Sequence, residues 1–435
     1  MSALLPSAHS WFDGPDHGRS SLRPAAASHC TTTPRAPQGV RVLVRPLETK
    51  VDGATFAHVD AALAAALREA LSKFRWLAVT DEKKCTNGLD PVGQILASIW
   101  PDDRHYAVDG SLFALGPQVR VCIRLTDSRT GQIVWAGHFD QRSNDHLALI
   151  DDLSQRMGSE LERAIQLAET AKASRMANDR LQAHDCIMRA IPLIFSMSAD
   201  RLQSADQLLR CASEAEPSSG SSYVWRAFAQ LIRIGQQWAP DLPAAIAEID
   251  WLTRTAIERD PQDAMAWALR GHVQAFVFHD YERALDCFDR CLRLNPGLAH
   301  GWAFSAITFC YLGLTDEAAL RLSRYRQLCP LDPYPFYFNT ASCLLLALTG
   351  RYERAVQVGR QVLNENPNYF AAYRPLIASL AQTDQIDEAR AHLAKLHANE
   401  PHFTIEWLRT KYPPLLSSCL DEYVKGFRRA GVPES

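Results

Sequence analysis

Two pairs of residues have the types and spacing from which metal or redox chemistry could arise. Cys287 and Cys291 lie four residues apart, so on a helix they share one edge, where two thiols could hold a metal or form a redox pair. Free cysteine also packs as a small buried hydrophobe, and Cys291 stands at a position that small side chains occupy in helical repeats. The two cysteines are therefore predicted to pack in the core. His392 and His397 lie five residues apart and do not share a helix face well, so they predict no metal site.

Paired carboxylates are the other candidates for chemistry. Asp102-Asp103 follows a proline in a predicted loop, and Asp151-Asp152 lies in a predicted helix, where adjacent side chains diverge. Both pairs are expected to be solvated or to cap helices. The sequence contains no GxGxxG, GxxxxGK[ST], HExxH or GxSxG motif. It therefore predicts no enzyme activity, no catalytic residue, no metal and no cofactor.

Composition and charge limit the partners of the chain. Hydrophobic residues make up 47% and charged residues 22% of its 435 residues, as in soluble globular proteins. The net charge of −3 argues against nucleic acids and acidic membranes, which require a basic surface. Eleven scattered cysteines without a CxxC motif, and an N-terminus without secretory features, predict a reducing, cytoplasmic location. The uncharged run 333–350 is too short and too polar to span a bilayer.

The N-terminal part of the sequence predicts a small mixed α/β sheet domain. Residues 1–38 are rich in Ser, Ala, Pro and Gly and are expected to form a disordered leader. Within 39–144, β-branched and alternating runs predict strands at 40–46, 75–81, 105–116, 118–127 and 131–140. Apolar residues at helical spacing predict helices at 56–74 and 92–100. A long amphipathic helix within 145–180 is expected to link this domain to the rest of the chain.

A repeat of about 34 residues follows. Prolines recur at intervals of 34, 37 and 34 residues, at Pro296, Pro330, Pro367 and Pro401. The copy that ends at Pro330 carries the expected small and large apolar residues at Trp302, Ala306, Gly313, Ala318 and Leu322. Small residues let two helices approach, and proline ends the second helix, as in the tetratricopeptide repeat. The sequence predicts the α+β class, with an all-α tetratricopeptide superhelix over 181–402 and a C-terminal helical cap over 403–435.

Several phrases support a more specific resemblance. They are RVLVRPL, LREALSKFRWLAVTD, YAVDGSLFALGPQVRVCIRLTDSRTGQIVWAGHFD and the tail HFTIEWLRTKYPPLLSSCLDEYVKGFRRAGVPES. In this order they resemble bacterial proteins in which a TolB-type N-terminal domain precedes tetratricopeptide repeats. Relatives often carry an upstream winged-helix or adenylate cyclase domain, so the resemblance implies transcription or signalling. The residues before Val40 are too few for either domain.

The first helix of each repeat lines the concave side of such an array, which predicts a partner-binding groove. The residues expected to face it are Met265, His272, Phe276, His300, Ile307, Tyr311, Tyr337, Leu344, Leu348 and Arg374. Apart from Arg374, they lack the cations and amides that would clamp a carboxylate. A mainly apolar and aromatic groove fits an amphipathic helix or an extended apolar segment of a protein partner. Two alternatives stay open: the groove is covered by the α/β domain of the same chain, or by a second copy.

The sequence therefore predicts a non-enzymatic protein–protein interaction scaffold. The alternative is a regulatory protein of transcription or signalling, related to cyclase and winged-helix fusions, whose output domain is absent or supplied in trans.

Overall fold

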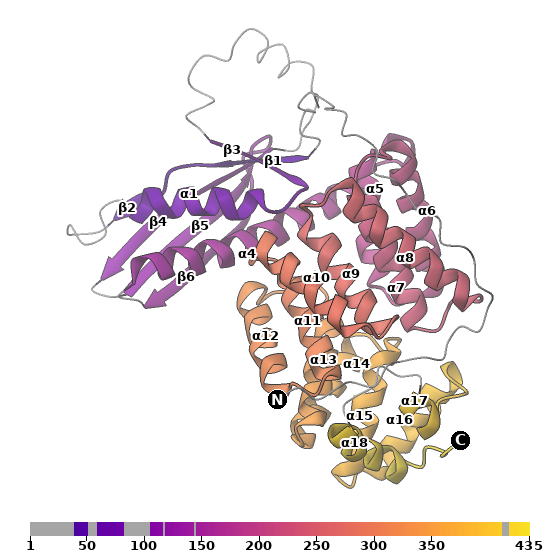
Figure 1. Cartoon of the computed structure of the whole chain (residues 1–435). Coiled ribbons are helices and arrows are strands. Elements are labelled where there is room, and N and C mark those ends of the chain that lie inside the picture. Colours follow the sequence, from indigo (N-terminus) through magenta and orange to yellow (C-terminus); the bar gives the residue numbers. More distant parts are fainter. Residues whose placement is uncertain (1–38, 51–58, 82–104, 116–117, 143–144, 411–416) are drawn as a thin grey trace, which may run out of the picture. The chain divides into compact units, whose positions relative to one another are not determined.

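The computed structural model describes residues 39–50, 59–81, 105–115, 118–142, 145–410 and 417–435. These residues form a six-stranded mixed sheet followed by a long series of helices, which confirms the predicted fold class (Figure 1). The strands are β1 (Val40–Val44), β2 (Glu48–Lys50), β3 (Leu77–Asp81), β4 (His105–Leu115), β5 (Gln118–Asp127) and β6 (Ile133–Arg142). The helices α1 (Val59–Ser72) and α4 (His146–Arg175) pack with them.

The strands of the sheet run in the order β3-β1-β4-β5-β6, with β2 beside β4. β1 is parallel to β3 and β4, whereas β4, β5 and β6 are antiparallel neighbours. The predicted β5–β6 hairpin is confirmed: the Asp127 carboxylate accepts hydrogen bonds from the backbone N–H groups of Arg129 and Thr130, and Gly131 has a φ of 71°. β2 was not predicted, because three residues are too few to show alternation. The predicted leader 1–38 and helix 92–100 lie outside the described residues.

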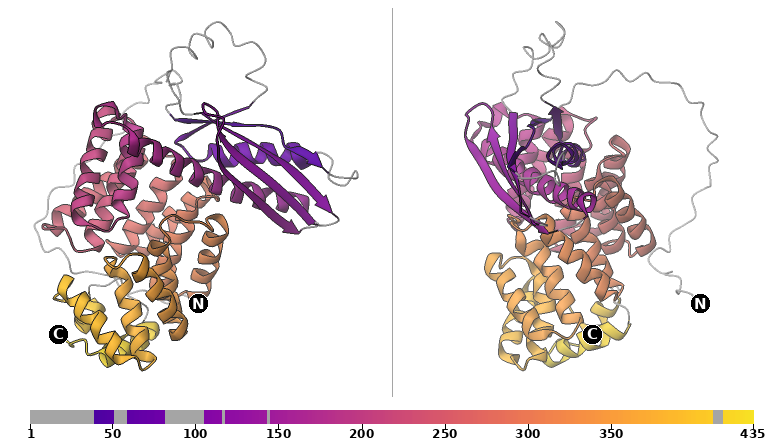
Figure 2. Two further views of the ribbon diagram at one scale, coloured as in Figure 1. Left: turned by 180° about the vertical axis from the view of Figure 1, so that it is seen from behind. Right: turned by 90° about the vertical axis from the view of Figure 1, so that its left-hand side faces the viewer.

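Helices α1 and α4 lie along one face of the sheet, as Figure 2 shows. Alternate residues of β5, such as Val121 and Ile123, are buried beneath them. Arg120 and Arg124 point to the opposite face, where they are exposed and form ion pairs with Asp140 and Asp109. The sheet therefore has its apolar core on one side only.

Between residues 183 and 399 the chain forms six helical hairpins, the repeat architecture that the sequence predicted. Their helices are α5 (Ala183–Ile194), α6 (Ala199–Ala215), α7 (Ser221–Gly235), α8 (Leu242–Arg259), α9 (Ala264–Phe276), α10 (Tyr281–Leu294), α11 (Ala299–Tyr311), α12 (Thr315–Leu328), α13 (Pro335–Leu348), α14 (Tyr352–Glu365), α15 (Tyr373–Gln382) and α16 (Ile386–Asn399). Short 3-10 helices span Asn178–Arg180 and Phe370–Ala372, and α17 (Ile405–Thr410) and α18 (Ser417–Ala430) follow the array.

The repeated residues pack as their spacing predicts. Ala306 of α11, Leu322 of α12 and Ala341 of α13 form one buried cluster, in which the large side chain of one hairpin contacts the small side chain of the next. The uncharged run 333–350 becomes α13, whose faces are covered by neighbouring helices. Among the described residues no helix is long and apolar enough to cross a membrane. The domain boundaries at 144, 180 and 402 remain predictions.

Helix α4 belongs to both the sheet and the array. Its N-terminal cap is Asp145, and its first half packs on α1 and β6. The Arg324 guanidinium of α12 donates hydrogen bonds to Asp152 Oδ1 at 2.6 Å and to Gln155 Oε1 at 2.8 Å. The end of α4 packs against α5, the first helix of the array. The sheet and the array therefore share one helix.

The Glu169 carboxylate, near the end of α4, is a buried contact between these elements. It accepts hydrogen bonds from the Tyr106 hydroxyl of β4 at 2.6 Å and lies 3.2 Å from His184 Nε2 of α5. Lys172 forms an ion pair with it at 3.1 Å. Burial by itself raises the pKa of Glu169, but the hydrogen bonds to His184 and Tyr106 and the charge of Lys172 together lower that pKa to about 2.

We expect Glu169 to make stability depend on pH. Because its pKa in the folded protein lies below the ordinary value of 4.5, its contribution is complete above that pH and disappears as the pH falls towards 2. Wild type should exceed Glu169→Gln in free energy of unfolding by about 3 kcal/mol at pH 7, and the difference should shrink below pH ~4.5. Urea unfolding of both proteins at pH 7, 4 and 3 measures this. A difference that stays constant over this range would contradict the assignment.

Candidate functional site

Seven of the ten predicted groove residues line one cavity of about 80 Å³. They are His272, Phe276, Ile307, Tyr311, Tyr337, Leu344 and Arg374. They come from α9, α11, α13 and α15, the first helices of successive hairpins, as the repeat phase predicted. The cavity lies near the C-terminal ends of α9 and α11, because its lining residues there occupy their last two turns.

The other three predicted groove residues lie outside this cavity. His300 stands in the first turn of α11, where its ring meets the Phe338 ring edge-on at a centroid distance of 5.3 Å. Burial, together with the nearby charge of Arg163 from α4, lowers the pKa of His300 to about 3. Met265 and Leu348 are half-buried against the core. Met265 and His300 lie in the first turns of α9 and α11, whereas the residues of these two helices that line the cavity lie in their last two turns.

The sequence did not reveal that α7 supplies another wall of the cavity. Leu231, Ile232, Gly235 and Gln236 line it from this helix and its end. Helix α7 precedes the well-marked copies of the repeat, so no phase could be counted for it. Its amphipathic pattern alone could have indicated an apolar face but not what that face meets.

His272 is the polar side chain at the centre of the site. It is 5% exposed, and its ring stacks on Phe304 at a centroid distance of 4.6 Å and on Phe276 at 5.8 Å. Its Nδ1 atom is buried and makes no hydrogen bond with any residue that the structure describes. Burial lowers the pKa of His272 to about 3, so the imidazole is neutral at pH 7.

Arg374 borders the cavity, but its charge is balanced within the protein. Its Nη2 atom donates to both carboxylate oxygens of Glu400, each at 2.6 Å, and both side chains are buried. The guanidinium also lies 5.5 Å from the centre of the Trp407 ring. The sequence identified Arg374 as the groove's one cation and missed its partner, which stands 26 residues later at the end of the same hairpin.

An early and a late hairpin of the array meet across its inner face. The Gln236 side chain donates to the backbone oxygen of Asn368 at 2.6 Å and accepts from the backbone N–H of Phe370 at 3.1 Å. Tyr311 and Leu344 are buried, at 4% and 5% exposure. At this cavity the expected groove is covered by elements of the array itself, and none of the lining residues belongs to the sheet domain.

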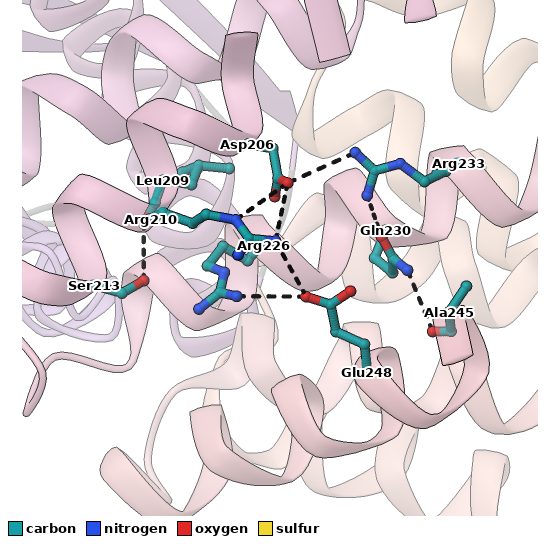
Figure 3. A network of polar contacts seen from close by, with 9 residues as sticks. All are labelled: Asp206, Leu209, Arg210, Ser213, Arg226, Gln230, Arg233, Ala245 and Glu248. Carbon is teal, nitrogen blue, oxygen red and sulfur yellow. Dashed lines mark hydrogen bonds and ion pairs between the residues drawn. The ribbon is translucent and has the colours of Figure 1, made fainter. Parts of the chain in front are cut away.

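A network of charged side chains holds α7 between α6 and α8 (Figure 3). Asp206 of α6 pairs with Arg210 and with Arg233 of α7, and Arg226 of α7 donates to Glu248 of α8 at 3.4 Å. These ion pairs connect α7, which lines the cavity, to both neighbouring helices.

The other candidates for chemistry have structural surroundings. Cys287 and Cys291 are buried, and burial raises the pKa of the Cys287 thiol to about 11 and that of Cys291 further, which fits core packing. His392 lies edge-on to an aromatic ring of α15, and His397 Nε2 lies 3.0 Å from the backbone oxygen of Phe403. Within the described part of the chain, no group of three or more His, Cys, Asp or Glu residues could hold a metal ion.

Of the acidic pairs, Asp102-Asp103 lies outside the described residues. Asp152 is engaged by Arg324 and by Arg156 of its own helix, and Asp151 is exposed. Neither member of the second pair approaches the cavity lining.

Residues 346–411 match the tetratricopeptide repeat family. The match spans α14 to α17, so it lies in the last part of the array, where the proline intervals predicted such repeats. A protein of Rhizobium meliloti (strain 1021) named "Putative adenylate cyclase 3" is 22% identical over 182 residues, 42% of this chain and 30% of that protein. The chain thus matches less than a third of the length of this curated relative.

Two solved structures are similar to parts of the chain. The Cut9 and Hcn1 structure, described as an APC/C hetero-tetramer, is 15% identical, with 65% of this chain and 53% of that chain covered and a TM-score of 0.40. TolB from Acinetobacter baumannii is 15% identical, with 29% of this chain and 28% of that chain covered and a TM-score of 0.20. The TolB-type assignment of the sheet domain remains a prediction.

Proposed function

We propose that this chain is a non-enzymatic, cytoplasmic interaction scaffold that binds an apolar or amphipathic segment of a partner protein at the cavity of its repeat array. The observation that supports this most directly is the convergence of seven groove residues from four hairpins on one cavity. A pocket of this kind receives an anchoring side chain in many protein interfaces, and such anchors contribute most of the binding energy.

The size of the cavity favours a side chain over a cofactor or a substrate. Cofactor and drug-sized ligand sites enclose roughly 300–1,000 Å³, whereas this cavity measures about 80 Å³. Its walls are mainly aliphatic and aromatic, and its charged member, Arg374, is balanced by Glu400. These features suit one apolar anchor of a protein segment.

Gly235 offers a way to fill the cavity without disturbing the fold. A Cβ atom there would meet nothing closer than the Phe276 ring at 3.8 Å, an ordinary van der Waals contact. We expect Gly235→Leu to place its side chain in the cavity and to reduce partner capture at least tenfold. The measurement is a pull-down from lysate of the source organism with the full chain as bait, read by mass spectrometry.

Gly235→Ala is the matched control, because a methyl group leaves most of the cavity open. A partner captured by wild type and Gly235→Ala but not by Gly235→Leu supports the proposal, and a synthetic peptide of its apolar segment should then compete. Equal capture by all three baits would show that binding does not use the cavity. Circular dichroism checks that each bait is folded.

The regulatory alternative has one observation in its favour, the match to the Rhizobium meliloti protein named "Putative adenylate cyclase 3". It predicts that a captured partner carries a cyclase or DNA-binding domain, whereas the scaffold proposal does not.

A further inference from the structure

We infer that the cavity selects one short, uncharged aliphatic side chain that carries a hydroxyl group, with His272 as its hydrogen-bond partner. Threonine is the amino acid with this chemistry. The inference rests on the proposed function and specifies the anchor that a partner segment would insert.

The side chains that line the cavity require an occupant that is largely apolar. Ile232, Ile307 and Leu344 line the cavity together with the Phe276 ring, so an occupant must present methyl or methylene groups to them. An engineered cavity of about 150 Å³ accepts benzene, and this cavity is about half as large. A short aliphatic group therefore fits, whereas an aromatic ring would have to displace the walls.

The absence of charge follows from the electrostatics of the lining. A charged side chain that enters this space loses its hydration, and only an opposite charge or several hydrogen bonds could replace that hydration. His272 is neutral because burial lowers its pKa, and the charge of Arg374 is balanced by Glu400 at 2.6 Å. A cation and an anion would therefore both lack a counterion in the cavity.

His272 favours an occupant that carries a hydroxyl group. Its buried Nδ1 has no hydrogen-bond partner among the described residues, which disfavours a cavity filled by hydrocarbon alone. In a neutral imidazole one nitrogen donates and the other accepts, and a hydroxyl group can satisfy either. Two further polar side chains of the lining, Gln236 and Thr340, already form hydrogen bonds within the protein. A carboxamide brings more donors and acceptors than the imidazole can satisfy, so the hydroxyl is the better match.

The test uses 2-butanol as a probe, because it carries a secondary alcohol like that of threonine. We expect it to shift the methyl NMR signals of Ile307 and Leu344 in the full-length, methyl-labelled chain in a saturable way. sec-Butylamine, a cation of the same carbon skeleton at pH 7, should bind at least tenfold more weakly. His272→Phe should weaken 2-butanol binding about fivefold, and Gly235→Leu should abolish it. His138→Phe, on an exposed position of β6, is the control and should bind as wild type does.

The inference is overturned if 2-butanol gives no saturable shift, if the amine binds equally well, or if folded His272→Phe binds the alcohol as wild type does. If His272→Phe fails to fold, the amine comparison and the Gly235→Leu variant decide. Alcohol binding without any partner that depends on Gly235 would refute the proposed function and leave this pocket chemistry standing. A cavity-dependent partner combined with no alcohol binding would refute the pocket chemistry alone.

Discussion

Glu400→Gln is expected to lower the free energy of unfolding of the array by about 3–5 kcal/mol. Glu400 is fully buried, and its carboxylate is the anion that neutralises Arg374, which is itself 6% exposed. An amide of the same shape keeps the volume but leaves a buried guanidinium without a counterion, and this is costly because the charge cannot regain its hydration. Urea unfolding, followed by far-UV circular dichroism, measures the loss.

Two further variants separate the ion pair from general damage. Arg374→Met combined with Glu400→Leu removes both charges, so it should recover most of the stability that Glu400→Gln loses. Asp421→Asn breaks an exposed ion pair with Arg409 and should change stability by less than about 1 kcal/mol. If the double variant is no more stable than Glu400→Gln, the unpaired charge is not the cause of the loss.

Phe304→Ala should also cost about 3–5 kcal/mol. Phe304 is fully buried in α11, and its ring contacts those of His272 at 4.6 Å, Phe338 at 5.2 Å and Phe228 at 5.9 Å. It therefore joins helices of three other hairpins, and its removal leaves a void that the packed rings cannot fill. Thermal and urea unfolding of the purified chain measure the effect.

Phe278→Ala is the matched control for this substitution. Phe278 follows α9 and is 39% exposed, so the loss of its ring should change the free energy of unfolding by less than about 1 kcal/mol. Equal destabilisation by the two variants would contradict the central role of Phe304 in the packing of the inner face.

The elements that depend on local pattern were predictable. The α11–α12 hairpin is indicated by Pro330 and by the small residues Ala306 and Ala318, because helix ends and close helix contacts depend on residues that are near one another in the sequence. The same phase brought Ile307 and Tyr311 to the cavity. The strands of the sheet followed from alternation, except β2, which is too short to show a period.

The features that depend on distant contacts were not predictable. Gln236 bonds to Asn368 across 132 residues, and nothing in the local sequence of either residue indicates the other. For this reason the sequence predicts the groove without α7 and without cover from the array itself, and it indicates Arg374 as a cation without its carboxylate. Repeat phase determines which side chains face inwards, whereas the way in which the hairpins close on one another decides how much of that face stays accessible.

The sharing of α4 has a consequence for how the chain can be divided. Leu149, Leu153 and Met157 of this helix are buried, where α4 covers the apolar face of the sheet, while Arg324 and His184 of the array contact its other residues. A polypeptide cut after residue 144 would leave the sheet without half of its cover, and one cut after residue 175 would leave the first hairpins without their support. Neither part is therefore a self-sufficient module, and a gene fragment that encodes only one of them should yield an insoluble product.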